Sequence, residues 1–204
     1  MEIIAKQERS KKRVKLILQT AESILLRDGL DAITIANIAK YSGLKRTSTY
    51  KFFPTTDSLK AMMIKGYLKD CENIFRGEVT SIETNQVSVI VLKTVEVIYE
   101  FFISSKAAQL IILKNTVSPP MSSESMHGLA SSIQYFIDKN IELPDMYNKS
   151  GVYRVLTQLI LSVFALNAKE NGELNEVGRI EAHRAGLSYL LNWINQSSWI
   201  WAIN

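Results

Sequence analysis

The sequence is poor in the residues that cross-link or interrupt a small fold. Its 204 residues include one cysteine, four prolines and nine glycines. The single Cys71 cannot form an intramolecular disulfide, and a thiol-rich metal site is excluded as well. Few prolines and glycines favour long uninterrupted helices over a turn-rich all-β fold. Because 47% of the residues are hydrophobic, a buried core is expected, and the composition predicts an all-α fold.

Long apolar runs and histidines are also scarce. The most apolar stretch, 155–168, is interrupted by Gln158, Ser162 and Asn167 and is shorter than the roughly 20 apolar residues that a membrane span needs. The N-terminus carries charges where a signal peptide needs an apolar core. These features predict a soluble, cytoplasmic protein. His127 and His183 have no neighbouring ligand at metal spacing, so we expect neither a metal site nor a cofactor.

Positive charge is concentrated in the N-terminal quarter of the chain. Residues 1–53 hold eleven Lys or Arg and five acidic residues, a net charge of +6, whereas residues 54–204 hold thirteen and fifteen, a net charge of −2. A small basic module joined to a larger, slightly acidic body is typical of a protein that binds nucleic acid with one end.

Residues 34–53 have the pattern of two short helices joined by a tight turn. Thr34 suits the N-cap of a helix that begins near Ile35, and we expect its hydroxyl to accept a hydrogen bond from the amide of residue 36 or 37. Gly43 ends that helix, because glycine adopts a positive φ without strain. A third helix is expected over 45–52, with a proline soon after it. The pattern predicts a helix-turn-helix.

A longer amphipathic helix precedes this stretch. Over residues 10–27, apolar side chains recur at spacings of three and four. Four cations between Lys11 and Lys15 fall in the first turns of this expected helix, where the helix dipole disfavours them. A nearby polyanion relieves that cost, but a solvated N-terminal arm explains the cluster equally well.

Six further helices follow, which brings the expected total to about nine. Asp57 or Thr56 is expected to cap the first of them. Residues 87–103 are rich in β-formers, but their length without a turn signal favours a helix. Paired prolines predict a loop over 116–125. The expected helices cover residues 57–80, 87–103, 106–115, 126–141, 147–169 and 176–195.

The last two of these helices are long and apolar. Residues 147–169 and 176–195 suit an intermolecular four-helix bundle between two copies of the chain. They can equally complete an internal core.

With the helices placed, residues 38–59, I-A-K-Y-S-G-L-K-R-T-S-T-Y-K-F-F-P-T-T-D-S-L, resemble the N-terminal domain of TetR/AcrR-family transcriptional regulators. The segment joins an Ile-Ala pair, the turn glycine Gly43, Tyr50, a Phe-Pro pair and an acidic residue two before Leu59, all on family spacing. About the first 60 residues share the resemblance. The remainder matches only in length and helical character.

The resemblance implies a three-helix DNA-binding domain over 1–56 and a larger helical domain over 57–204 for ligand binding and dimerisation. It implies a homodimer, joined through the two C-terminal helices, that binds a palindromic operator in double-stranded DNA. Most members of the family are repressors. A small-molecule effector in the larger domain then shifts the helix over 57–80 and changes the spacing of the two DNA-reading heads.

Three threonines depart from the family pattern. Thr56 replaces a lysine that commonly contacts backbone phosphate, so we expect that contact to be lost or weakened. Thr47 occupies a position often held by glycine or proline, and Thr49 replaces a usual aliphatic residue.

A recognition helix needs side chains that reach base edges and donors that contact phosphate. By position, Arg46 is expected to read guanine bidentately, Thr47 to contact a thymine methyl, and Tyr50 and Thr34 to donate to phosphate. Packing of Tyr50 against the first helix is an equally good interpretation of that residue. The candidate DNA-binding residues are Thr34, Lys45, Arg46, Thr47, Ser48, Tyr50 and Lys51.

An apolar effector cavity is expected to be lined by aromatic residues and methionines, with a few polar side chains orienting the ligand. Because no charged residue clearly marks the interior, an uncharged or amphipathic effector is favoured. Most of the aromatic residues are explained by core packing alone, and surface exposure explains the polar residues equally well. The candidate pocket residues are Tyr99, Phe102, Met126, Tyr135, Tyr153, Gln158 and Phe164, with Gln109, Asn115, Met121, His127, Phe136 and Asn167 as further members.

Other classes of function have less support in the sequence. No nucleophilic triad, phosphate-binding glycine loop, metal-ligand cluster or paired carboxylates indicate an enzyme. A helical interaction or ligand-binding protein that does not bind DNA is the second alternative, but it leaves the basic helix-turn-helix unexplained.

Overall fold

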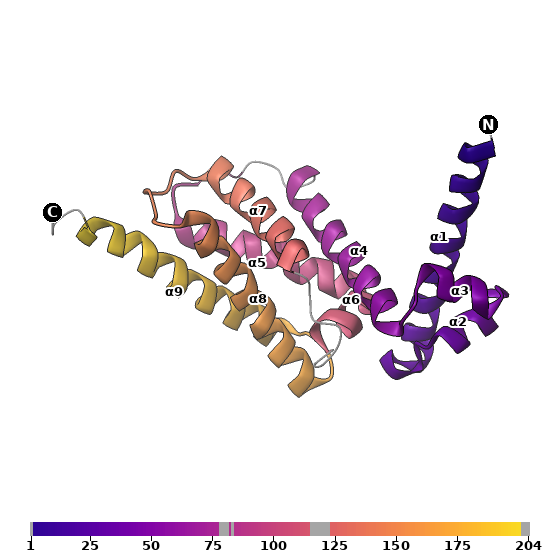
Figure 1. Ribbon diagram of the computed structural model, residues 1–204. Helices are drawn as coiled ribbons and strands as arrows, with labels where there is room; N and C mark the ends of the chain where they lie inside the picture. Colours follow the sequence, from indigo (N-terminus) through magenta and orange to yellow (C-terminus); the bar gives the residue numbers. More distant parts are fainter. Residues whose placement is uncertain (1, 78–81, 83, 115–122, 201–204) are drawn as a thin grey trace.

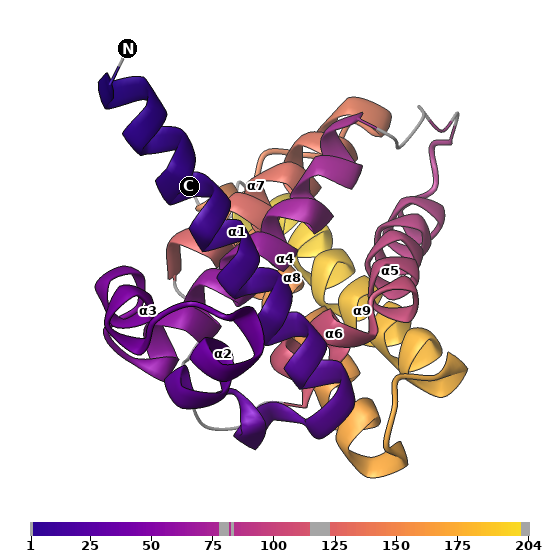
Figure 2. The same ribbon diagram turned by 90° about the vertical axis from the view of Figure 1, so that its right-hand side faces the viewer.

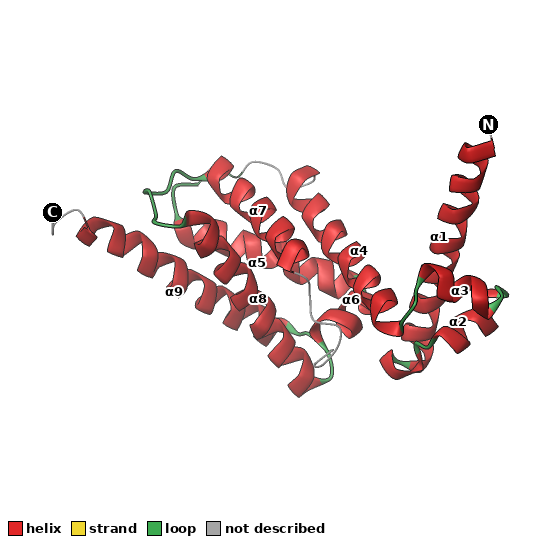
Figure 3. Ribbon diagram, viewed as in Figure 1, coloured by secondary structure: helices red, strands yellow, loops and turns green. Residues whose placement is uncertain are grey.

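The computed structural model describes residues 2–77, 82, 84–114 and 123–200, and all its regular elements are helical (Figures 1 and 3). The elements are α1 (Glu2–Asp28), η1 (Leu30–Ala32), α2 (Ile35–Ser42), α3 (Arg46–Phe52), α4 (Thr56–Gly77), α5 (Val87–Ser104), α6 (Lys106–Ala108), η2 (Gln109–Leu113), α7 (Ser123–Asn140), α8 (Lys149–Asn171) and α9 (Glu176–Ile200). The predicted all-α fold class is confirmed in the described part of the chain.

Helices α1, α2 and α3 form what we call the head. In Figure 2, α2 and α3 lie on one side of the C-terminal half of α1, whose N-terminal end extends beyond them. The apolar faces of these helices are buried against one another, with Ile17, Ile24 and Ile38 at 1% exposure or less. Such burial contributes most of the stability of short helices, which are marginal alone in water.

Two local predictions for the helix-turn-helix are confirmed. The Thr34 hydroxyl oxygen accepts a hydrogen bond from the Asn37 amide at 3.1 Å, as an N-cap should. Gly43 ends α2 with φ 71°, in the left-handed region that favours glycine. These two residues fix the start of α2 and the turn into α3.

Helix α1 is longer than the sequence pattern predicts. It begins at Glu2 rather than near Ser10, because residues 2–9 contain good helix formers and no glycine or proline. The basic cluster that begins at Lys11 therefore lies well inside the helix and not in its first turns. The predicted conflict between this cluster and the helix dipole is wrong, since the dipole acts within the terminal turn.

The cap of α4 differs from the prediction. Thr55, rather than Thr56 or Asp57, accepts a hydrogen bond from the Ser58 amide at 3.0 Å, and the Ser58 hydroxyl accepts in return from the Thr55 amide at 3.3 Å. This reciprocal pair satisfies amide groups that the first helical turn leaves free. α4 ends at Gly77, and the predicted extension to residue 80 lies outside the described residues.

Helices α4 to α9 form what we call the body. Helix α5 covers the segment that is rich in residues with high β-strand propensity, and the helix predicted from its length is confirmed. Ile90, Val95 and Ile98 of this helix are fully buried. α6 continues into η2, a single π-helical segment. Within the predicted loop over 116–125, the described residues 123–125 already belong to α7. α8 begins at Lys149, two residues later than predicted, because Asn148 has φ 53°.

Helix α8 packs against α7, α9 and η2. Among the described helices, α8 is the one that is long and apolar enough to cross a membrane, judged by length and composition alone. The mean hydropathy of its apolar window is 1.3. Half of that apolar window is buried inside the fold. Leu156, Ile160 and Phe164 are fully buried along it, so part of its apolar composition serves the core.

The approach of α9 to α8 depends on Gly178. A Cβ there would lie 2.6 Å from Oδ1 and 2.9 Å from Cβ of Asn167, which is buried. Asn167 cannot move away freely, because its Oδ1 accepts from the Asn175 amide at 3.0 Å. The space between the two helices is therefore sized for glycine.

Gly178→Ala is expected to lower the free energy of unfolding by about 1–2 kcal/mol, because the overlap with Asn167 outweighs the better helix propensity of alanine. The matched control is Gly66→Ala in α4, where a Cβ meets no atom within 4 Å. That control is expected to raise stability by up to about 1 kcal/mol. Thermal unfolding followed by circular dichroism measures both, and equal melting temperatures would contradict the argument.

Candidate nucleic-acid interface

Helix α3 and its N-cap expose most of their polar side chains. One residue of the helix, Thr49, is fully buried beneath them, and its hydroxyl donates to the Lys45 carbonyl oxygen at 3.4 Å. A threonine therefore occupies the buried position where the family pattern has an aliphatic residue. Ser48 is half-buried, and the exposed residues are Lys45, Arg46, Thr47, Tyr50 and Lys51.

The start of α2 contributes Thr34, which is partly buried. Its oxygen accepts from the Asn37 amide, so the hydroxyl proton remains available to donate to a phosphate. The Asn37 side chain donates to the Ala32 carbonyl oxygen at 2.8 Å, which holds the first turn of α2 against the preceding segment. One hydrogen bond thus fixes the Thr34 hydroxyl, and a second fixes the Asn37 side chain beside it.

Arg46 and Tyr50 contact each other one turn apart on α3. Arg46 Nη2 donates to Tyr50 Oη at 3.3 Å, and the guanidinium carbon lies 5.6 Å from the ring centroid. Tyr50 is 41% exposed, so its ring is on the surface rather than in the core. Such an exposed contact is weak, and Arg46 can exchange it for a base edge or a phosphate.

The charge around α3 has one sign. Residues 32–56 contain four Lys or Arg and no acidic residue. None of the three cations on α3 and its N-cap forms an ion pair with an acidic side chain among the described residues. A surface of this kind attracts polyanions.

A second cationic cluster, which the sequence analysis missed, lies at the end of α2. The Arg27 guanidinium carbon is 4.5 Å from the ring centroid of Tyr41, and Lys40 Nζ is 5.3 Å from the same centroid. Arg27 also donates to both carboxylate oxygens of Asp28, which lowers the pKa of that carboxyl. Only the fold could reveal this cluster, because Arg27 lies on α1 and Tyr41 on α2.

The basic cluster on α1 is exposed to solvent. Lys11 forms an ion pair with Glu8 at 3.2 Å, one turn earlier on the same helix. Lys12, Arg13 and Lys15 are also exposed. Both sequence interpretations of this cluster, a contact with a polyanion and a solvated arm, are compatible with that exposure.

The structure brings three of the candidate effector-pocket residues into ring contact, since Tyr99 meets Phe164 edge-on with centroids 6.2 Å apart, but it does not arrange the set around one cavity. Several of them pack in the core: Phe102 meets Phe164 edge-on with ring centroids 6.4 Å apart. Tyr153 is fully buried, and its hydroxyl donates to Asp138 at 3.1 Å. Burial is the main cause that raises the pKa of the Tyr153 phenol, and the Asp138 carboxylate raises it further. Tyr135 is 57% exposed on α7. The buried members are Phe102, Gln109, Phe136, Tyr153, Phe164 and Asn167.

Gln109 illustrates why buried polar residues need not mark a ligand. Its side-chain nitrogen donates to the Phe102 carbonyl oxygen at 3.1 Å, and its side-chain oxygen accepts from the Leu174 amide at 2.9 Å. The residue thus joins α5 to the segment between α8 and α9. Its polar groups are satisfied by the fold itself.

The remaining members line two separate surface grooves. Met126, His127 and Gln158 contribute to a groove of about 500 Å³ bordered by α7, α8 and α9. Tyr99 lies in another groove, where Arg179 pairs with Glu96 at 3.6 Å. Asn115 and Met121 lie outside the described residues.

Comparison with known sequences gives a short match. Two uncharacterised HTH-type transcriptional regulators, from two strains of Mycobacterium tuberculosis, are 35% identical to this chain over 54 residues. The match covers 26% of this chain and 29% of each relative, so less than a third of the relatives' length is matched. No family profile matches the chain.

Comparison with solved structures extends over most of the chain. A TetR-family regulator from Streptomyces coelicolor has a TM-score of 0.67 and 14% identity, covering 89% of this chain and 99% of its own. A TetR regulator from Rhodococcus sp. RHA1 has a TM-score of 0.68 and 15% identity, covering 89% and 98%. The multidrug binding protein EbrR, solved with imidazole, has a TM-score of 0.58 and 13% identity, covering 85% and 94%. The likeness shows a shared fold.

Proposed function

We propose that this chain, which has the fold of TetR-family transcriptional regulators, is a transcription regulator that binds double-stranded DNA through α3. One observation carries the proposal: the second helix of the helix-turn-helix and its N-cap expose three cations and two hydroxyl side chains, in a stretch without acidic residues. Duplex DNA carries a phosphate charge about every 1.7 Å along its axis, so a surface of this kind gains affinity by releasing counterions.

The exposed residues divide into base-reading and phosphate-contacting groups. Arg46 and Thr47 stand in the first turn of α3, the part of a recognition helix that reaches base edges in the major groove. Lys45, Lys51 and Tyr50 surround them as phosphate donors, with Thr34 and Ser48 at the margin. Thr56, which is partly buried, is proposed to make a weaker phosphate contact than the family's lysine.

Dimerisation is proposed through α8 and α9. Large apolar side chains on these two helices remain exposed in the single chain, at 58% for Leu166, 61% for Val177 and 40% for Ile180. On α9 the spacing of three and seven residues places Val177, Ile180 and Leu187 along one stripe. Packing this surface against a second copy makes a four-helix bundle and sets the two heads about 34 to 36 Å apart, one turn of DNA.

We assign DNA binding to residues 1–56 and dimerisation and effector binding to residues 57–204. The proposed effector is a small uncharged or amphipathic molecule. We propose that its binding reduces repression. EbrR, which shares the fold, is described as a multidrug binding protein, and the groove that contains Met126 and Gln158 offers about 500 Å³. The protein would act as a repressor in the cytoplasm, where its DNA lies, and no catalytic residue enters the proposal.

Selection from a pool of random duplex DNA tests the proposal. The purified chain is expected to enrich a palindromic sequence, and gel shifts at several salt concentrations are expected to show affinity falling steeply with salt. Failure to enrich any sequence, together with affinity that does not depend on salt, would favour a helical protein that does not bind DNA.

A further inference from the structure

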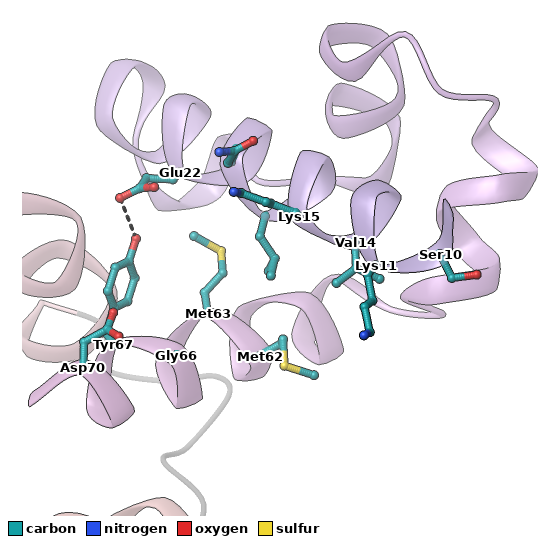
Figure 4. A pocket seen from close by; sticks show the side chains of 12 residues that line it. Ser10, Lys11, Val14, Lys15, Glu22, Met62, Met63, Gly66, Tyr67 and Asp70 are labelled. Carbon is teal, nitrogen blue, oxygen red and sulfur yellow. Dashed lines mark hydrogen bonds between the residues drawn. The ribbon is translucent and has the colours of Figure 1, made fainter. Parts of the chain in front are cut away.

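A groove of about 530 Å³ lies between α1 of the head and α4 of the body (Figure 4). It is separate from the body grooves described above, and neither the proposed DNA contacts of α3 nor the proposed dimer surface uses it. Its size is in the range of small-molecule sites. Residues 10–22 of α1 form one wall and residues 62–70 of α4 form the other.

The middle of the groove is apolar and adaptable. Val14 of α1 faces Met62 and Met63 of α4, as Figure 4 shows, and Leu18 of α1 also lines the groove. Methionine side chains fit irregular ligands and make favourable sulfur contacts with aromatic rings. The space beside Gly66 is open, since a Cβ built there meets no atom within 4 Å. A flat aromatic molecule fits such walls.

The two ends of the groove carry opposite charge. Glu22, Tyr67 and Asp70 lie at one end and Lys11 at the other, with Lys15 between them, as Figure 4 shows. Lys15 is exposed, so solvent screens its charge. Lys11 is exposed and already paired with Glu8. Glu22 is partly buried, so its charge is less screened by solvent. The acidic end therefore dominates recognition of a charged ligand.

Tyr67 joins the head to the body at this acidic end. Its hydroxyl donates to Glu22 Oε1 at 3.0 Å, across the groove from α4 to α1. Burial raises the pKa of the Tyr67 phenol, and the Glu22 and Asp70 carboxylates raise it further. The negative potential that these carboxylates exert on the phenol is the potential that a cation would meet.

We propose that this groove binds a flat amphipathic cation, with its charged nitrogen at Glu22 and Asp70 and its rings between Val14 and Met62. A molecule held there contacts both α1 of the head and α4 of the body. It therefore fixes the orientation of the head relative to the body. Occupancy thereby selects one spacing of the two heads and alters DNA affinity. This second consequence rests on the proposed function, whereas binding in the groove does not.

Fluorescence titration of the full chain with the N-methyl dimethylaminostyrylpyridinium cation, without DNA, tests the site. Saturable binding at one site per chain is expected. Gly66→Leu fills the groove and is expected to weaken binding about tenfold or more, whereas Ala61→Leu, which adds the same side chain at an exposed position of α4 outside the groove, changes it less than about twofold. Equal binding by the native protein and by Gly66→Leu overturns the proposal.

Charge recognition is tested with a neutral probe of the same shape, dimethylaminostyrylpyridine, at a pH where its nitrogen is unprotonated. Glu22→Gln is expected to weaken binding of the cation about fivefold and to leave the neutral probe within about twofold, because only the cation loses an ion pair. An equal effect on both probes overturns the charge assignment.

Gel shifts on the selected DNA test the link to regulation. The cation is expected to change the DNA affinity of the native protein by about fivefold or more, and that of Gly66→Leu by less than about twofold. Unchanged DNA affinity of the native protein at saturating cation overturns the link while the site itself stands. If the chain binds no DNA, the proposed function fails, and the titrations without DNA still decide the site.

Discussion

Leu166→Glu combined with Val177→Glu is expected to convert the proposed dimer into a monomer and to lower operator affinity about 100-fold or more, because binding through two linked heads exceeds binding through one by a factor of this order. The two side chains are 58% and 61% exposed, so the single chain does not need them for its core. In a dimer they would be desolvated against the partner's apolar stripe. Four buried glutamates at one symmetric interface would carry a large desolvation cost.

Sedimentation equilibrium measures the oligomeric state and gel shift the affinity. Ile103→Glu is the matched control, since Ile103 is an aliphatic residue, 44% exposed, that lies on α5 outside the stripe. It is expected to leave the dimer intact. A dimer that survives both glutamates on α8 and α9 would place the interface elsewhere.

Arg46→Ala is expected to weaken binding to the selected DNA by about 10- to 100-fold and to relax specificity at one base pair in each half-site, because a bidentate arginine–guanine contact contributes about 1–3 kcal/mol of discrimination. The melting temperature is expected to stay unchanged. Arg46 is exposed, and its contacts among the described residues are with the neighbouring Tyr50. Selection from random DNA with the variant protein shows whether the preference at that position is lost.

Lys51→Ala is expected to weaken binding to all sequences by a similar factor and to reduce the salt slope by about one per subunit, since each lost phosphate contact releases about one counterion fewer. Lys139→Ala, an exposed lysine of α7 in the body, is the control and should leave both quantities unchanged. An unchanged salt slope for Lys51→Ala would show that Lys51 stays in solvent and does not contact a DNA phosphate.

Most helices of this protein could be predicted because their signals are local. The N-cap at Thr34, the left-handed Gly43 and the apolar spacing of α5 each depend on a few neighbouring residues, and each prediction is confirmed. Helix ends were less predictable. Thr55, Thr56 and Asp57 are all good N-cap residues, and the reciprocal hydrogen bonds with Ser58 decide in favour of Thr55.

The candidate ligand residues show where sequence reasoning stops. Periodicity identifies the apolar face of a helix, but an apolar side chain that fills the core and one that borders a cavity have the same spacing. Phe164 and Met126 are both apolar residues on helical spacing, yet the first is fully buried and the second lines a surface groove. Which residues surround open space depends on how far apart the packed helices stand.

The sequence alone determined that this protein is helical, that its N-terminal quarter is basic, and that Lys45, Arg46 and Lys51 belong to a helix-turn-helix. These properties follow from composition and from interactions between residues within a few turns of one another. Only the tertiary structure decided that Arg27 stacks on Tyr41, that Gly178 lets α9 approach α8, and that Glu22 and Tyr67 meet across a groove between head and body. Those contacts join residues far apart in the chain, and their geometry is set by the packing of whole helices.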